Sequence, residues 1–144
     1  MLNIEFVSRM VVALAAGLAI GFERQWHHKA AGLRTTTLVA IGSALYVLLS
    51  VMLTKTNGGD ATRIIGQVVT GIGFLCGGVI FKEGFSVHGL TTAATIWCSS
   101  AIGCLAAAGY YSETILATIL IILVNVLLKP IDNWLSKRKS TENS

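Results

Sequence analysis

Long apolar segments separated by short polar ones dominate the chain. Five windows hold almost only apolar and small residues, at about residues 4–22, 35–53, 64–81, 90–108 and 112–128. A helix needs about 20 such residues to cross the hydrocarbon core of a bilayer. The windows are continuous and lack the strict apolar–polar alternation of membrane β-barrel strands. The pattern therefore predicts an all-α polytopic integral membrane protein with five transmembrane helices.

The fifth window is the shortest, and its strictly apolar part begins only at Ile115. Pro130 follows it, and we expect this proline to end the helix because it lacks the backbone N–H and clashes with the preceding turn. Residues 1–130 would then form the transmembrane domain, and residues 131–144 a polar, frayed cytoplasmic tail.

Composition supports a lipid environment. Hydrophobic residues make up 53% of the 144 residues and charged residues only 12%, about half the charged share of an ordinary soluble domain. So few charges could not cover the surface of a soluble fold. The net charge of +4 is spread between and after the apolar windows, so nucleic acid is not an expected partner.

Basic residues also predict the orientation. Two connections, 22–35 and 81–90, and the tail from residue 129 would share one membrane side, and together they carry eight of them: Arg24, Lys29, Arg34, Lys82, Lys129, Lys137, Arg138 and Lys139. The other side carries three: Arg9, Lys55 and Arg63. Cytoplasmic segments are enriched in Lys and Arg, so we expect the N-terminus outside and the C-terminus in the cytoplasm.

Two helix starts resemble each other. Gly32-Leu-Arg-Thr-Thr-Thr-Leu opens the second window and Gly89-Leu-Thr-Thr-Ala-Ala-Thr opens the fourth. Each follows a helix rich in small residues that ends in a charged cluster. Either this short similarity is chance, or residues 10–50 and 70–107 form a parallel repeat of two helical hairpins about an axis along the membrane normal.

Small residues form stripes on two of the predicted helices. Gly66, Thr70, Gly73 and Gly77 share one face of the third, and Gly17 and Gly21 form a G-x-x-x-G on the first. Such stripes let another helix backbone approach closely. We expect them to serve helix packing, with the lining of a pathway as the alternative.

Charged residues gather at the cytoplasmic ends of the first four windows: Glu23, Arg24, Arg34, Lys82 and Glu83. One interpretation places them at headgroup level, where basic side chains snorkel at little cost. The other is a polar vestibule, in which Glu23 and Glu83 pair with Arg34 or Arg24, or offer oxygens to a cation. Two carboxylates beside basic residues are a weak cation trap, so no metal site is predicted.

Other polar residues carry less specific signals. Asn125 is expected to hydrogen-bond a neighbouring helix, and Glu5 and Arg9 have the spacing of an i, i+4 ion pair. His27 and His28 are adjacent and point about 100° apart on a helix, so they do not form a metal-binding pair.

The three cysteines, Cys76, Cys98 and Cys104, lie inside apolar windows and are expected to be packing residues. No acid–base constellation is visible in the sequence, so neither an enzyme nor a cofactor is predicted.

Four motifs in order resemble the MgtC/SapB family: Gly21-Phe-Glu-Arg-Gln-Trp26, Ala31-Gly-Leu-Arg-Thr35, Gly71-Ile-Gly-Phe-Leu75 and Gly89-Leu-Thr-Thr-Ala-Ala-Thr-Ile-Trp97. The resemblance covers roughly residues 10–130. It implies a bacterial inner-membrane protein with five helices, associated with growth under magnesium limitation and survival within macrophages. It also implies a regulatory role through other inner-membrane proteins, including restraint of the F-type ATP synthase, whereas magnesium transport is not established for the family.

The resemblance also assigns functional positions. The family's glutamate after the third helix matches Glu83, and its cysteine after the tryptophan matches Cys98. The polar residue after Gly-Leu, often asparagine, is Thr91 here, and a hydroxyl has fewer donors than an amide. Many members continue into a soluble C-terminal domain, and the resemblance here covers the membrane domain only.

Two functions remain open from the sequence. The first is a non-enzymatic regulatory protein that binds other membrane proteins through its helix faces, with self-association also compatible with the glycine stripes. The residues expected to act are Glu83, Thr91, Cys98, Glu23, Arg24 and Arg34. The second is a small channel or transporter for magnesium or another cation.

Overall fold

The computed structural model describes the backbone of residues 4–142, and the side chains of that range other than 56, 57, 133 and 136–142. In order, the elements are α1 (Ile4–Trp26), α2 (Leu33–Asn57), α3 (Thr62–Val79), β1 (Phe81–Glu83), β2 (Ser86–His88), α4 (Leu90–Ala108) and α5 (Tyr111–Glu142). Each of the five described helices is long and apolar enough to cross a membrane. The predicted all-α polytopic fold is confirmed.

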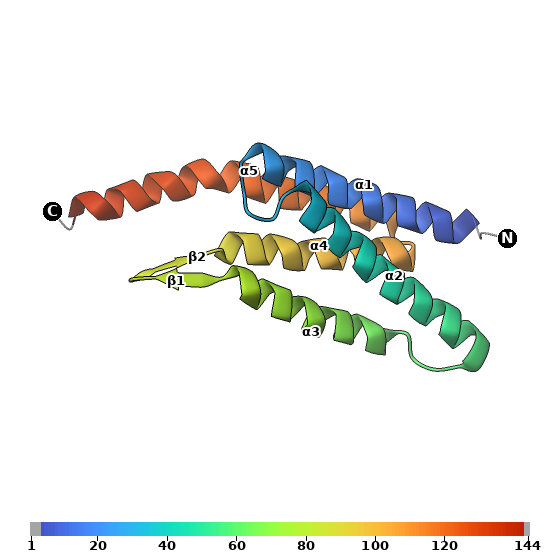
Figure 1. The fold of residues 1–144 in the computed structure, drawn as a ribbon. Helices are drawn as coiled ribbons and strands as arrows, with labels where there is room; N and C mark the ends of the chain where they lie inside the picture. The colour runs from blue at the N-terminus through green and yellow to red at the C-terminus, as the bar shows by residue number, and fades with distance from the viewer. Residues whose placement is uncertain (1–3, 143–144) are drawn as a thin grey trace.

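The helices alternate in direction, so the two termini lie at opposite ends of the molecule (Figure 1). The loop of residues 27–32, the β1–β2 hairpin and the distal part of α5 share one end, which we call the hairpin end. The α2–α3 and α4–α5 loops share the other end with the N-terminus. Helices α1 and α3 therefore run in the same direction, as a parallel repeat requires, although the repeat itself stays a prediction.

Helix α4 occupies the centre of the bundle and contacts α1, α2, α3 and α5. Its backbone approaches α2 so closely that a Cβ atom on Gly103 would overlap the carbonyl group of Ala40. Near this crossing, the hydroxyl oxygens of Ser43 and Ser100 lie 2.8 Å apart. The adjacent core consists mainly of small side chains, Ala13, Ala44, Val47, Leu48, Ala106 and Ala107. Small residues allow this close approach in lipid, where van der Waals packing and hydrogen bonds drive helix association.

Helix α3 lies at the periphery. It packs mainly against α4, and of its residues only Val68 is buried in the described structure. Because α2 and α3 diverge, a mostly apolar groove of about 680 Å³ opens between them. Leu38, Gly42 and Tyr46 line it from α2, and Gln67, Gly71 and Leu75 from α3.

A short β-hairpin joins α3 to α4, and the sequence pattern did not predict it. Phe81 pairs with His88 and Glu83 with Ser86, which leaves Gly84 and Phe85 as a two-residue loop. Gly84 has φ +61°, a left-handed conformation that glycine adopts without strain. Three-residue strands are too short to produce a recognisable alternation of apolar and polar positions.

Three helices extend further than expected: α2, which spans Leu33–Asn57 where 35–53 was predicted, and also α1 and α5. We predicted that Pro130 would end the fifth helix, but α5 continues through it to Glu142. That prediction was wrong because a proline removes a single hydrogen bond, here the one to the Val126 carbonyl. Pro130 lies near the end of the candidate span at Asp132, where water or headgroups can supply a donor.

Helix α1 continues to Trp26, four residues beyond the predicted limit at 22. Its last turns are held by tertiary contacts, because Glu23 and Arg24 are buried against neighbouring helices.

Candidate functional site

A buried polar cluster joins α1, α4 and α5 at the hairpin end. Arg24 is only 1% exposed, although it lies in the last turn of α1. Its Nη2 atom donates a hydrogen bond of 2.7 Å to the hydroxyl oxygen of Thr92, in the first turn of α4. Its Nε atom is buried and has no hydrogen-bond partner among the described residues. A charged donor with so few partners is costly to bury, so the opposite charge of the adjacent Glu23 matters for this site.

Glu23 connects α1 with α5. The Nδ2 atom of Asn125 donates to one carboxylate oxygen of Glu23 across 3.2 Å. The predicted hydrogen bond of Asn125 to a neighbouring helix is therefore confirmed. The other carboxylate oxygen lies 3.0 Å from Nδ1 of His27, one turn further along α1. With 9% of its surface exposed, Glu23 is an interior residue with two specific partners.

The two glycines of α1 bring the cluster close to α2. A Cβ atom on Gly17 would lie 2.9 Å from the Cα atom of Thr37, and one on Gly21 would lie 2.7 Å from the Cα atom of Leu33. The hydroxyl of Thr36 lies within hydrogen-bond distance of the Gly17 and Gly32 carbonyl oxygens, at 3.2 and 3.0 Å. The close packing of α1 on α2 thus depends on glycine at both positions.

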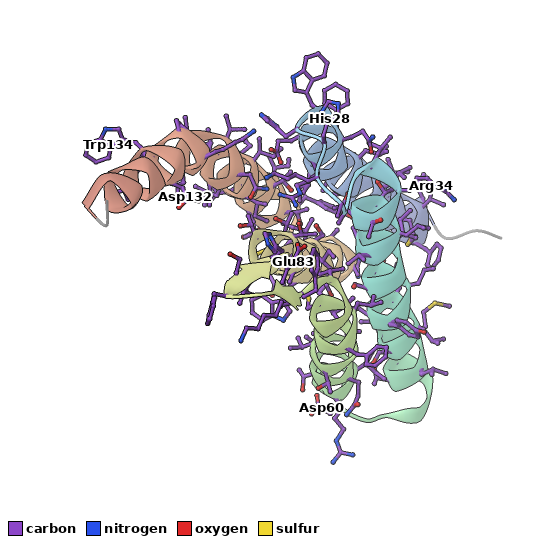
Figure 2. All side chains as sticks on the ribbon, turned by 60° about the vertical axis from the view of Figure 1, so that its left-hand side comes forward. His28, Arg34, Asp60, Glu83, Asp132 and Trp134 are labelled. Carbon is purple, nitrogen blue, oxygen red and sulfur yellow. The ribbon has the colours of Figure 1, made fainter. Side chains whose placement is uncertain are left out.

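The structure does not bring the remaining sequence-predicted residues into this cluster. Glu83 lies in β1 and Arg34 in the first turn of α2, and both side chains are exposed (Figure 2). Thr91 is exposed beside the buried Thr92. Cys98 is a half-buried free thiol further along α4. Among the described side chains, the polar vestibule that would pair Glu83 with Arg34 or Arg24 does not form in this conformation.

The sequence analysis missed two members of the cluster. Thr92 carries no signal that separates it from Thr91, because the two differ only in which way they face on α4. His27 follows Glu23 by four residues, a spacing that places both on one face of a helix, so its pairing could have been read from the sequence. Within the described residues, no group of three or more His, Cys, Asp or Glu lies close enough to hold a metal ion.

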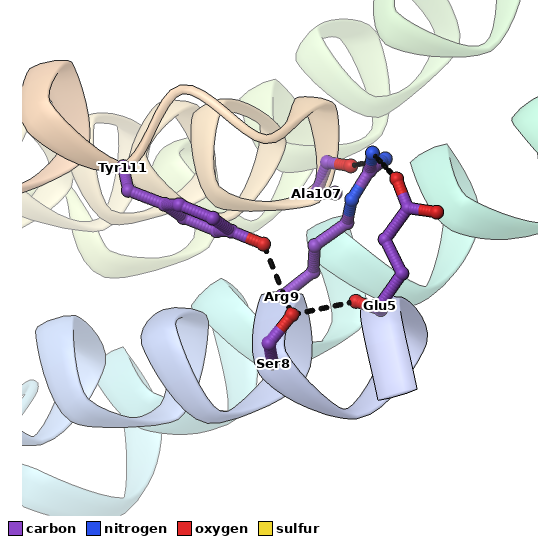
Figure 3. Close-up of polar contacts among 5 residues, drawn as sticks. All are labelled: Glu5, Ser8, Arg9, Ala107 and Tyr111. Carbon is purple, nitrogen blue, oxygen red and sulfur yellow. Dashed lines mark hydrogen bonds and ion pairs between the residues drawn. The ribbon is translucent and has the colours of Figure 1, made fainter. Parts of the chain in front are cut away.

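A second polar cluster lies at the opposite end of the bundle (Figure 3). Arg9 forms an ion pair with Glu5, as the sequence spacing predicted, and its Nη1 atom donates a 2.6 Å hydrogen bond to the carbonyl oxygen of Ala107. The hydroxyl oxygens of Ser8 and Tyr111 are 3.0 Å apart. Arg9 thereby places a positive charge at the C-terminus of α4, where the helix dipole favours cations.

Comparison with known proteins identifies the relatives of this chain. A model of the MgtC family matches residues 10–134. Protein MgtC of Brucella abortus is 54% identical over 119 residues, which cover 83% of this chain and 49% of that protein. Protein MgtC of Salmonella typhimurium is 45% identical over 129 residues, which cover 90% of this chain and 54% of that protein.

An uncharacterized protein of Synechocystis is 48% identical over 132 residues, covering 92% of this chain and 56% of that protein. No solved structure matches the chain significantly. The chain spans about half the length of these curated relatives. Because the family model covers most of the residues and includes four of the candidate spans in full and most of the first, this chain is a membrane protein that belongs to the MgtC family.

Proposed function

We propose that this chain is the membrane domain of a regulatory protein of the bacterial inner membrane, which acts by binding other membrane proteins. The contact surface is the outward face of α3, defined by Gly66, Thr70, Gly73 and Gly77, which we call the glycine face. The hairpin end lies in the cytoplasm and the N-terminus outside. The side of the hairpin end carries eight Lys and Arg residues and the side of the N-terminus carries three, which supports this orientation.

The observation that carries the proposal is the empty space beside the glycine face. A Cβ atom on Gly66, Gly73 or Gly77 would meet no atom within 4 Å, whereas one on Gly17, Gly21 or Gly103 would press against another helix. The glycines of α1 and α4 thus serve packing within the chain, and those of α3 do not. A smooth stripe exposed to lipid allows close packing of another protein's helix.

The polar cluster favours binding over ion passage. Glu23 is engaged by His27 and Asn125, and Arg24 by Thr92. These contacts tie α1 to α4 and α5, so the buried charges have a structural role in this conformation. Charged side chains that stay exposed at the hairpin end, among them Arg34 and Glu83, are then available to a partner at the membrane surface.

The family resemblance suggests which partner and which physiology to test. We propose that the F-type ATP synthase is among the partners, and that the interaction supports adaptation to low magnesium and survival inside host cells. Glu83, Thr91 and Cys98 are the residues that this resemblance assigns to partner binding. Glu83 lies on β1 and Thr91 in the first turn of α4, both at the hairpin end, and Cys98 lies further along α4.

Crosslinking in native membranes tests the proposal. A photoreactive side chain at the exposed position Thr70 should attach to a membrane protein, which mass spectrometry identifies. Gly73→Leu should abolish the adduct while leaving the chain folded, because its Cβ position is unoccupied. Gly71→Leu is the matched control, since Gly71 is equally open but lines the α2–α3 groove instead.

Two outcomes would contradict the proposal. Adducts that survive Gly73→Leu but disappear with Gly71→Leu would move the contact to the groove. Ion flux through liposomes of purified protein, lost on Glu83→Gln, together with no adduct at Thr70, would establish a transporter in place of a regulator.

A further inference from the structure

Helix α5 is too long to lie entirely within a bilayer. At about 1.5 Å per residue, its 32 residues span about 48 Å, whereas the hydrocarbon core is about 30 Å thick. Its distal part projects past the other helices at the hairpin end (Figure 1). The candidate span stops at Asp132, so the following residues must lie in the headgroup region or in water.

An apolar face continues along α5 beyond this point. One helix face carries, at positions i, i+1, i+4, i+7 and i+8, Leu127, Leu128, Ile131, Trp134 and Leu135. Ile131, Trp134 and Leu135 are 52%, 59% and 52% exposed. Trp134 and Asp132 project from different sides of the helix (Figure 2). The segment is therefore amphipathic, and in water it would expose three large apolar side chains.

The charges around this face are mostly positive. Lys129 lies between Leu128 and Ile131 of this stretch, and the sequence continues after it with Lys137, Arg138 and Lys139, whose side chains lie outside the described residues. Asp132 is the only acidic residue in the range 127–139. Basic amphipathic helices bind the surface of anionic membranes, with tryptophan and leucine inserted between headgroups. A polybasic segment beside a transmembrane helix adds electrostatic attraction to acidic lipids.

We propose that residues 129–139 form a membrane-surface helix that binds anionic phospholipid headgroups of the leaflet at the hairpin end. Ile131, Trp134 and Leu135 insert at the boundary between headgroups and acyl chains. Pro130 allows the change of direction, because the missing hydrogen bond at its ring weakens the helix where the segment must tilt away from the span. This lipid site goes beyond the proposed contact with partner proteins, which uses α3.

Tryptophan quenching in reconstituted full-length chain tests the proposal. Replacing the exposed Trp26 and Trp97 by phenylalanine leaves Trp134 as the single tryptophan of the three. Lipids brominated near the headgroup should quench Trp134 at least about twice as strongly in membranes containing phosphatidylglycerol as in pure phosphatidylcholine. High salt should reduce the difference, because it screens the charges. Lys137→Gln/Arg138→Gln/Lys139→Gln should abolish the difference.

Controls separate this effect from general changes in the protein. Lys55→Gln/Arg63→Gln removes charges from the opposite end and should leave the quenching of Trp134 unchanged. A chain with Trp97 alone should show no dependence on lipid charge. If the tryptophan variant does not fold, a thiol-reactive fluorophore on Leu135→Cys, in a chain whose free Cys76, Cys98 and Cys104 are replaced by alanine, provides the same comparison. Equal quenching of Trp134 in both membranes, whether strong or weak, would overturn the proposal.

Discussion

Arg24 at the end of α1 donates a hydrogen bond to Thr92 at the start of α4, across 2.7 Å and 68 positions of sequence. This contact joins the two halves of the chain that the sequence relates as possible repeats. It also makes Thr92, which no motif singled out, one of the residues that hold the buried charge of the bundle in place.

Thr92→Val should destabilise the fold. The substitution preserves shape but removes the acceptor of the buried Arg24, whose Nε atom already lacks a partner among the described residues. Leaving a buried donor unsatisfied costs about 1–3 kcal/mol, and more when the group is charged. Thermal unfolding in detergent measures the loss. Thr91→Val is the matched control, because Thr91 is exposed and should change stability by less than about 0.5 kcal/mol. Equal effects of the two variants would refute this role of Thr92.

Glu23 and Asn125 should show energetic coupling. Their hydrogen bond of 3.2 Å connects α1 to α5, and such bonds between membrane helices are worth about 0.6–1.7 kcal/mol. A double-mutant cycle with Glu23→Ala and Asn125→Ala should therefore give a non-additive free energy of unfolding of this size. Additivity within about 0.3 kcal/mol would show that the two side chains act independently.

The stability of the fold should require glycine at position 103 of α4 but not at position 73 of α3. Gly103→Ala places a methyl group against the backbone of Ala40, whereas Gly73→Ala enters open space. Overpacking of this kind costs about 1–3 kcal/mol, so the yield and melting temperature of folded protein should fall for Gly103→Ala alone. A larger loss of yield and melting temperature for Gly73→Ala than for Gly103→Ala would mean that α3, rather than α4, is at the centre of the packing.

Asp60 should titrate below its ordinary pKa of 3.8, because the hydroxyl and backbone N–H of Thr62 donate to its carboxylate. A lowered pKa in the folded state stabilises the fold above pH 3.8, and this contribution is lost as the pH falls through the folded pKa. Thr62→Val should raise the pKa towards 3.8, as carboxyl-carbon NMR can measure. Thr70→Val, on the same helix but bonded to Gly66, should leave it unchanged. No response to Thr62→Val would exclude the side-chain contribution.

Much of the fold follows from the sequence because lipid forces each apolar window to satisfy its own backbone groups as a helix. The fourth window, 90–108, coincides with α4, and charge counts alone suggest an orientation. The ion pair of Glu5 with Arg9 was likewise predictable, and so was a hydrogen bond from Asn125 on α5 to a neighbouring helix. The first depends only on helix spacing, and the second on the cost of leaving an amide unpaired in lipid.

Tertiary structure decided which neighbour each helix face meets. Helical spacing places Gly17 and Gly73 on stripes of the same kind, yet only Gly17 packs against another helix of the chain. Sequence grouped Glu23 with Glu83, and the fold separates them: one is buried beside Asn125 and the other is exposed on a hairpin. The physical reason is that the periodicity of a helix determines only which side of that helix a residue faces. The identity of what lies in that direction depends on the packing of all five helices together.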